Sequence, residues 1–125
     1  GGVRAMKLSK GDFLIGCDVV KKTFVNPEFL VLTSNGYGKK TALKEYKVQK
    51  RGGSGIKTVK VTPKTGPLIA SRVVMPELTE IVAISKKSQV IRTELAEISS
   101  LGRQTQGVRI MRLREGDSIA SLTCL

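Results

Sequence analysis

An internal repeat with a period of 52 residues runs through this sequence of 125 residues. The repeat superimposes three pairs of segments: Leu30–Thr33 on Val82–Ser85, Lys40–Tyr46 on Arg92–Ile98, and Gly55–Val61 on Gly107–Leu113. A further copy of the last block begins the chain at Gly2–Leu8. Units of this length that are rich in β-branched residues are typical of blades or stacked supersecondary units. The period therefore predicts an all-β array of about two and a half units.

The strongest strand signal in each unit is a hairpin. Phe29–Thr33 is an apolar run followed by Asn35-Gly36, a pair that favours a type I′ turn, and the return strand is expected over Tyr37–Thr41. In the second unit we expect the same hairpin from Ile81–Ser85, a turn at residues 86–88, and Gln89–Thr93. The segment after each hairpin is too short for a stable helix and is interpreted as a corner.

Two more strands are predicted in each unit. The block Gly55–Val61 alternates between apolar and charged residues, which places a core face opposite a face with repeated cations. A turn and a last strand follow, at Phe13–Cys17, Leu68–Val73 and Ile119–Cys124 in the three copies. Four strands for each unit predict propeller-like blades of antiparallel sheet.

The repeat also divides the chain. Residues 1–26 are interpreted as the end of one blade with its connection, 27–78 as a complete blade, and 79–125 as a following, truncated blade. Because repeat units bury their faces against neighbours, these open ends predict a strand-swapped dimer or marginal stability.

Charge is the strongest compositional signal. The 22 Lys and Arg residues outnumber the 10 Asp and Glu residues, which gives a formal net charge of +12. Nine of the basic residues lie between Lys39 and Lys64, where Glu45 is the only acidic residue. This distribution favours a face that binds a polyanion. Histidine is absent, so the commonest general base and metal ligand are missing, and we expect no catalysis, metal or cofactor.

The loop 49–55, Gln-Lys-Arg-Gly-Gly-Ser-Gly, lies in the middle of this basic region. Its glycines allow close approach of the backbone to a ligand, and Lys50 and Arg51 supply positive charge, so the loop suits phosphate oxygens. The Gly-Lys-Ser/Thr of a nucleotide-binding P-loop is absent. The alternative interpretation is a flexible solvated turn.

Several of these segments resemble the C-terminal domain of DNA gyrase A. The resemblance rests on Asn35–Thr41, Glu45-Tyr46, Gln49–Gly55, Arg92-Thr93, Glu97–Ser99 and Gly102–Arg109. The loop 49–55 is similar to the family's gyrase A box, Q-R-R-G-G-[K/R]-G, and departs from it at Lys50 and Ser54. The nearest related family is the corresponding C-terminal domain of topoisomerase IV. The family's box usually lies in the first blade, whereas here the end of another blade precedes the loop. The loop 49–55 is therefore either the box itself or a second, box-like loop.

The resemblance implies a β-pinwheel whose basic rim binds and bends double-stranded DNA, as a non-catalytic part of an ATP-dependent type II topoisomerase that introduces negative supercoils. Its partners would be the remainder of gyrase A and, through it, gyrase B. The family's cleavage tyrosine belongs to another domain, so neither Tyr37 nor Tyr46 is expected to be that nucleophile. Tyr46, the equivalent of Ile98, is interpreted as a packing residue, and Tyr37, the equivalent of Gln89, lies next to a hairpin. No apolar stretch of about 20 residues and no signal peptide are seen, and the expected location is the cytoplasm.

The residues predicted to contact DNA lie on the return strands and on the basic loops. They are Lys39, Lys40, Lys44, Lys47, Gln49, Lys50, Arg51, Gly52, Gly53, Ser54, Gly55, Lys57, Arg92 and Arg103. No recognition helix is apparent, so the phosphate backbone rather than the base sequence should be bound. Two alternatives remain: structural blades that contact other protein chains without wrapping DNA, and an RNA-binding protein, for which no aromatic stacking platform is seen.

Overall fold

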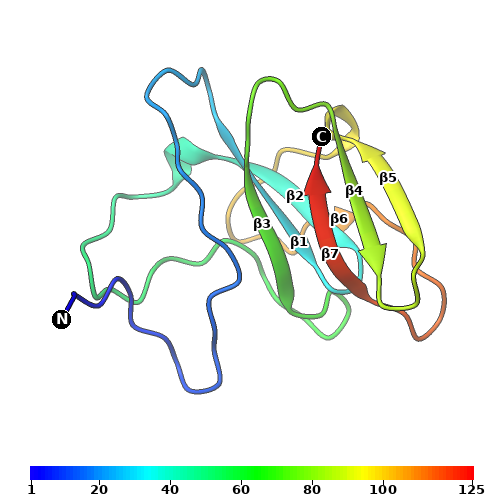
Figure 1. The fold of residues 1–125 in the computed structure, drawn as a ribbon, viewed down its shortest axis with the longest axis horizontal. Coiled ribbons are helices and arrows are strands. Elements are labelled where there is room, and N and C mark those ends of the chain that lie inside the picture. The colour runs from blue at the N-terminus through cyan, green and yellow to red at the C-terminus, as the bar shows by residue number, and fades with distance from the viewer.

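The computed structural model describes residues 1–125 and contains two antiparallel sheets (Figure 1). The first sheet has the order β3-β1-β2-β6, from β1 (Glu28–Thr33), β2 (Tyr37–Ala42), β3 (Leu68–Val74) and β6 (Val108–Arg109). The second has the order β5-β4-β7, from β4 (Glu80–Ser85), β5 (Val90–Glu94) and β7 (Ile119–Cys124). Short 3-10 turns, η1 (Leu43–Glu45) and η2 (Leu95–Glu97), follow β2 and β5. The predicted all-β class is confirmed, and no helix is long and apolar enough to cross a membrane.

The two hairpins repeat as the sequence predicts. β1 pairs with β2 so that Glu28 is opposite Ala42, and β4 pairs with β5 so that Glu80 is opposite Glu94. The two 3-10 turns lie at the predicted corners. The period therefore holds in the register of the hydrogen bonds as well as in the residue types.

The turn between β1 and β2 differs from the predicted type I′ turn. Three residues, 34–36, connect the strands, and only Gly36 among them has a positive φ, of 85°. The Gly36 N–H donates to the carbonyl of Thr33 at 3.1 Å. This arrangement is a three-residue loop that ends in a left-handed residue. Ser88, one period later, has the same left-handed φ, at 65°.

The fourth strand of the first sheet comes from the second repeat unit. β6 pairs with β2, with Tyr37 opposite Arg109 and Gly38 opposite Val108. The prediction that each unit forms its own four-stranded sheet is therefore wrong, because hydrogen bonds of β2 recruit the block one period further along the chain. The equivalent edge of the second sheet, at β5, has no partner strand in this structure.

Three predicted strands are not formed. The segments Gly2–Leu8, Phe13–Cys17 and Gly55–Val61 contain no ladder, apart from a single bridge between Met6 and Gly53. Gly55–Val61 is the equivalent of the block that contains β6, but no return strand lies beside it in either sheet. These segments therefore lack the partners that would complete their hydrogen bonds.

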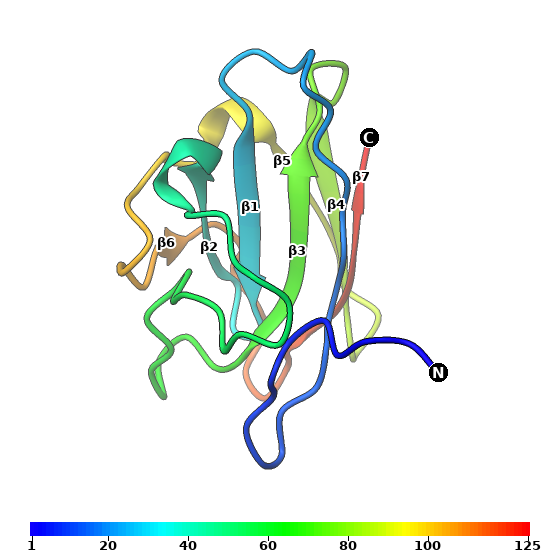
Figure 2. The same cartoon turned by 90° about the vertical axis from the view of Figure 1, so that its left-hand side faces the viewer.

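The core lies between the two sheets. Leu30 and Leu32 of β1 and Ile81 and Ala83 of β4 are fully buried and belong to one apolar cluster that Met111 also joins. In Figure 2, β1 and β3 stand in front of β4 and β5, which places this cluster between the layers. Strand alternation directs these side chains to one face and leaves the turns and outer edges for charged residues.

Candidate nucleic-acid interface

The loop 49–55 is mostly exposed, and it is joined to the beginning of the chain. The side chains of Lys50 and Arg51 are exposed and form no ion pair. Gly52 has a left-handed φ of 77°, and its N–H donates to the carbonyl of Ala5 at 2.9 Å. One of the backbone donors expected to face a phosphate is therefore used within the chain. The side chains of Lys50 and Arg51 can still contact a phosphate, whereas the Gly52 N–H already has a partner within the chain.

Five predicted cations are exposed, and none makes a side-chain hydrogen bond or an ion pair in the structure. They are Lys44, Lys47, Lys50, Arg51 and Lys57. All five lie in the segment that connects the start of η1 to β3. This segment therefore carries five positive charges that no acidic side chain pairs with. We call these five residues the basic connection. Their contact with DNA stays a prediction.

Lys39 has a different place from the one predicted. Its residue is fully buried, and its Nζ donates to the carbonyls of Gly102, Arg103 and Thr105 at 2.5, 2.9 and 3.0 Å. The Thr105 hydroxyl is a fourth partner, at 3.1 Å. The prediction of Lys39 as a surface contact for DNA is therefore corrected: the ammonium holds the loop 102–105 of the second unit against β2.

Burial changes the acidity of this ammonium. The pKa of Lys39 is lowered to about 8, mainly by desolvation, which Glu45 opposes and Arg103 supports. An unfolded chain keeps the Lys39 proton up to its ordinary pKa of 10.5. Between these two values the unfolded state binds more protons, so the Lys39 contribution makes the free energy of unfolding rise with pH.

We expect the ε-carbon resonance of Lys39 to titrate with a midpoint near pH 8. The physical reason is the loss of water around the charged form in the buried site. An NMR pH titration with selectively labelled lysine, assigned by loss of one signal in a Lys39→Met variant, measures it. A midpoint at the ordinary lysine value would contradict the burial.

Lys40 and Arg92 are equivalent in the two repeats, and both are paired with carboxylates. The Nζ of Lys40 donates to the carbonyl of Leu95 at 2.9 Å and lies 3.9 Å from the Glu28 carboxylate. Arg92 forms an ion pair with Glu80, and its side chain is 64% exposed. Lys40 is thus largely withdrawn from the surface, at 13% side-chain exposure, whereas Arg92 remains reachable.

The remaining predicted cation, Arg103, is half-buried. Its Nη1 donates to the carbonyl of Lys57 at 2.9 Å, which connects the second unit to the basic connection. The tyrosines also have structural contacts: the Tyr46 ring packs edge-on against Phe29 at 5.8 Å, and its hydroxyl contacts Thr58. No group of three or more Cys, Asp or Glu residues is placed to hold a metal ion.

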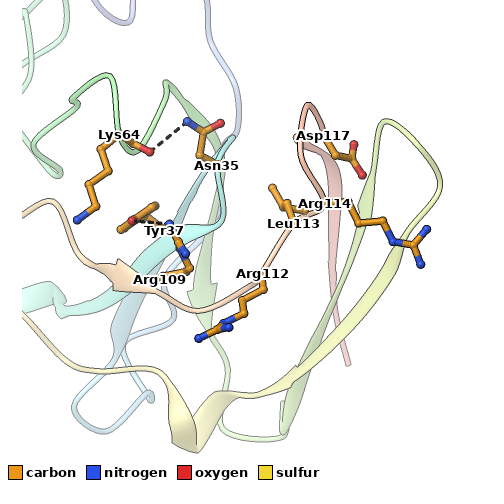
Figure 3. Close-up of a pocket in the computed structure, with 8 residues that line it drawn as sticks. All are labelled: Asn35, Tyr37, Lys64, Arg109, Arg112, Leu113, Arg114 and Asp117. Carbon is orange, nitrogen blue, oxygen red and sulfur yellow. Dashed lines mark hydrogen bonds between the residues drawn. The ribbon is translucent and has the colours of Figure 1, made fainter.

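The structure also gathers basic residues that the predicted set omits. Lys64, Arg109, Arg112 and Arg114 line one pocket, in which Lys64 and Arg109 lie beside Tyr37 and the Arg114 side chain extends away from it (Figure 3). Arg112 lies in the alternating block, where a cation repeats in every copy, and this repetition was the available signal. Sequence reasoning missed the cluster because its members belong to different repeat units that β6 brings together.

Comparisons with known proteins agree on one family. The family model for the DNA gyrase C-terminal domain, beta-propeller, matches residues 1–21, 27–74 and 79–125. The DNA gyrase A protein of Aminobacterium colombiense is 41% identical over 96% of this chain, and that of Mycolicibacterium smegmatis is 40% identical over 97%. The matched region is 14% of the length of each of these two relatives. The chain therefore spans about one seventh of these proteins.

Two solved structures are similar in fold. A DNA gyrase A C-terminal domain matches with a TM-score of 0.72 and 30% identity, over 79% of this chain and 33% of its own. The C-terminal domain of a DNA topoisomerase IV matches with a TM-score of 0.81 over 97% of this chain and 36% of its own. Its identity is 23%, so this second likeness concerns the fold alone.

Proposed function

Because the chain belongs to the family of DNA gyrase C-terminal domains, we propose that it is a non-catalytic module that binds and bends double-stranded DNA. In this proposal residues 27–78 and 79–125 are blades, and residues 1–26 belong to a preceding one. The module serves a bacterial type II topoisomerase in the cytoplasm, and its protein partners are the rest of gyrase A and, through it, gyrase B. Its role there is to support negative supercoiling by wrapping the duplex.

The observation that carries this proposal is the basic connection. It presents five exposed cations without counter-charges, and the whole structure contains only two ion pairs for 22 basic residues. Unpaired cations on one connection bind a phosphate backbone by releasing its counterions, without reading bases. The affinity is then expected to depend on salt and on the ease of bending, not on sequence.

We expect a duplex of roughly 40 base pairs to bind with a log–log salt slope of about −4.5 from the basic connection alone, at about −0.9 for each phosphate neutralised. Replacing both Lys50 and Arg51 with alanine should reduce the magnitude of the slope by about 2 and weaken binding at about 0.1 M salt by one to two orders of magnitude. Fluorescence anisotropy at several salt concentrations measures both quantities.

The matched control is Lys21→Ala/Lys22→Ala. This pair is also exposed and adjacent, and it lies in the segment that leads into β1. An equal loss in both double variants would contradict a contact at the loop 49–55. A folded wild-type chain that does not bind duplex at low salt would reject the proposal and leave the alternative, structural blades that contact other protein chains. Preference for single-stranded RNA would favour the RNA-binding alternative.

A further inference from the structure

A cavity of about 430 Å³ lies at the junction of the two repeat units (Figure 3), and none of the five residues of the basic connection lines it. We call it the seam pocket. Its chemistry comes from Tyr37, Lys64, Arg109, Arg112, Arg114 and Asp117. Four cations and one carboxylate therefore share one hollow, which is a strong local surplus of positive charge.

The carboxylate in this pocket, Asp117, has hydrogen-bond partners at one oxygen, whereas its Oδ2 is buried without a partner. One oxygen of Asp117 accepts the backbone N–H groups of Lys87 at 3.1 Å and Ser118 at 2.8 Å. Although desolvation opposes it, hydrogen bonding to Ser85 and to these two N–H groups lowers the pKa of Asp117. Neither ion pair of the structure involves the four cations. Their charge is therefore not neutralised within the chain.

The pocket is held in place by a buried aromatic ring. Tyr37 is 5% exposed, with the Lys64 Nζ 5.6 Å and the Arg109 guanidinium carbon 5.4 Å from its ring centre. The Nη2 of Arg109 also donates to the Tyr37 hydroxyl at 3.1 Å. Asn35 donates to the carbonyl of Lys64 at 3.1 Å, which fixes the turn that carries this lysine. Arg109 and Lys64 are therefore placed beside the ring before any ligand binds, which reduces the reordering that they need to bind an anion.

Both repeat units contribute to the seam pocket. Tyr37 and Lys64 belong to the first unit, and the three arginines belong to the second. The units meet where the N–H groups of Ile110 and Met111 donate to the Gly36 carbonyl at 2.9 and 3.2 Å. An anion in this pocket would therefore contact both sides of the junction between β2 and β6.

We propose that the seam pocket binds a backbone phosphate of double-stranded DNA, so that the bound duplex bridges the two repeat units. Guanidinium groups match phosphate oxygens with paired hydrogen bonds, and the ammonium adds a point charge. The inference rests on the proposed function, and it adds a second contact surface to the basic connection. Binding at the pocket also stabilises the junction, because a ligand held by both units favours the paired state.

The test uses the full chain and a Lys64→Ala/Arg112→Ala variant, since neither side chain makes a hydrogen bond or an ion pair. Relative to the Lys21→Ala/Lys22→Ala control, the salt slope for a duplex of roughly 40 base pairs should lose about 2 in magnitude, and binding near 0.1 M salt should weaken at least tenfold. In hydrogen exchange, the duplex should protect the amides of Ile110 and Met111 in the wild type and less in the variant.

The outcomes separate the two proposals. If the wild type fails to bind duplex, the proposed function is rejected. If the wild type binds and the pocket variant equals the control in slope and in exchange, only the seam pocket is rejected. Inorganic pyrophosphate is the second probe: binding that is lost in the pocket variant, together with unchanged duplex binding, would assign the pocket to a free phosphate compound and overturn the duplex contact.

Discussion

Replacing Lys39 with methionine is expected to lower the free energy of unfolding by about 3 kcal/mol. The side chain is fully buried, and its ammonium is the partner of three carbonyls and one hydroxyl in the loop 102–105. Methionine fills a similar volume but donates nothing, so these four acceptors lose the hydrogen bonds of the ammonium. Urea unfolding followed by far-UV circular dichroism measures the difference.

The control for this prediction is Lys47→Met. Lys47 is exposed and makes no side-chain hydrogen bond, so its replacement should change stability by less than about 0.5 kcal/mol. Similar losses in the two variants would show that the buried ammonium contributes no more than a surface charge. A loss confined to Lys39→Met would assign a structural role to the buried ammonium.

Lys39 shows where sequence reasoning reaches its limit. Lysine is rarely buried, so a lysine on a return strand in a basic region is naturally predicted on the surface. Its acceptors are in the loop 102–105, about sixty positions later, and no local pattern indicates that this loop folds over β2. The repeat held one signal of burial, because Ile91, the equivalent of Lys39, is apolar and packs against the core cluster.

The hairpins were predictable because their information is local. β1 and β2 are joined by three residues, and the apolar run Phe29–Thr33 followed by Asn35-Gly36 marks the first strand and the turn. The partner of β6 was not predictable in this way, because the block Gly107–Leu113 has the same pattern whichever hairpin it joins. The period shows that the blocks are equivalent, and the hydrogen bonds alone show that the second one joins the first sheet.

The candidate site also has one part that the sequence predicts and one part that it does not. The exposed cations of the basic connection follow from a run of lysines and arginines that is visible in the sequence. The seam pocket depends on the pairing of β6, from the second repeat unit, with β2 of the first, because this pairing brings Arg109 opposite Tyr37. The residues of the pocket could therefore not be grouped before the sheet order was known. A surface formed by one segment is readable from sequence, whereas a surface formed across a junction requires the fold.

The junction itself can be tested with two glycines that occupy the same place in the repeat. Gly55 and Gly107 both have a φ of 80°, so alanine suffers the same backbone strain at either position. A Cβ at Gly107 would lie 2.6 Å from the Gly38 carbonyl oxygen, whereas a Cβ at Gly55 would meet nothing within 4 Å. Comparing the two alanine variants therefore separates the loss of stability caused by backbone strain from the loss caused by disturbing the pairing of β6 with β2.

We expect Gly55→Ala to lower the free energy of unfolding by about 1 kcal/mol and Gly107→Ala to lower it by about 3 kcal/mol. The additional loss arises because Gly38 is a backbone partner of β6 and cannot move away without breaking that pairing. Urea unfolding gives the two values, and faster hydrogen exchange at Ile110 in Gly107→Ala alone would locate the extra loss at the junction. Equal losses in the two variants would mean that the pairing of β6 with β2 contributes little to stability. A duplex bound at the seam pocket would then add little stability by holding the two repeat units together.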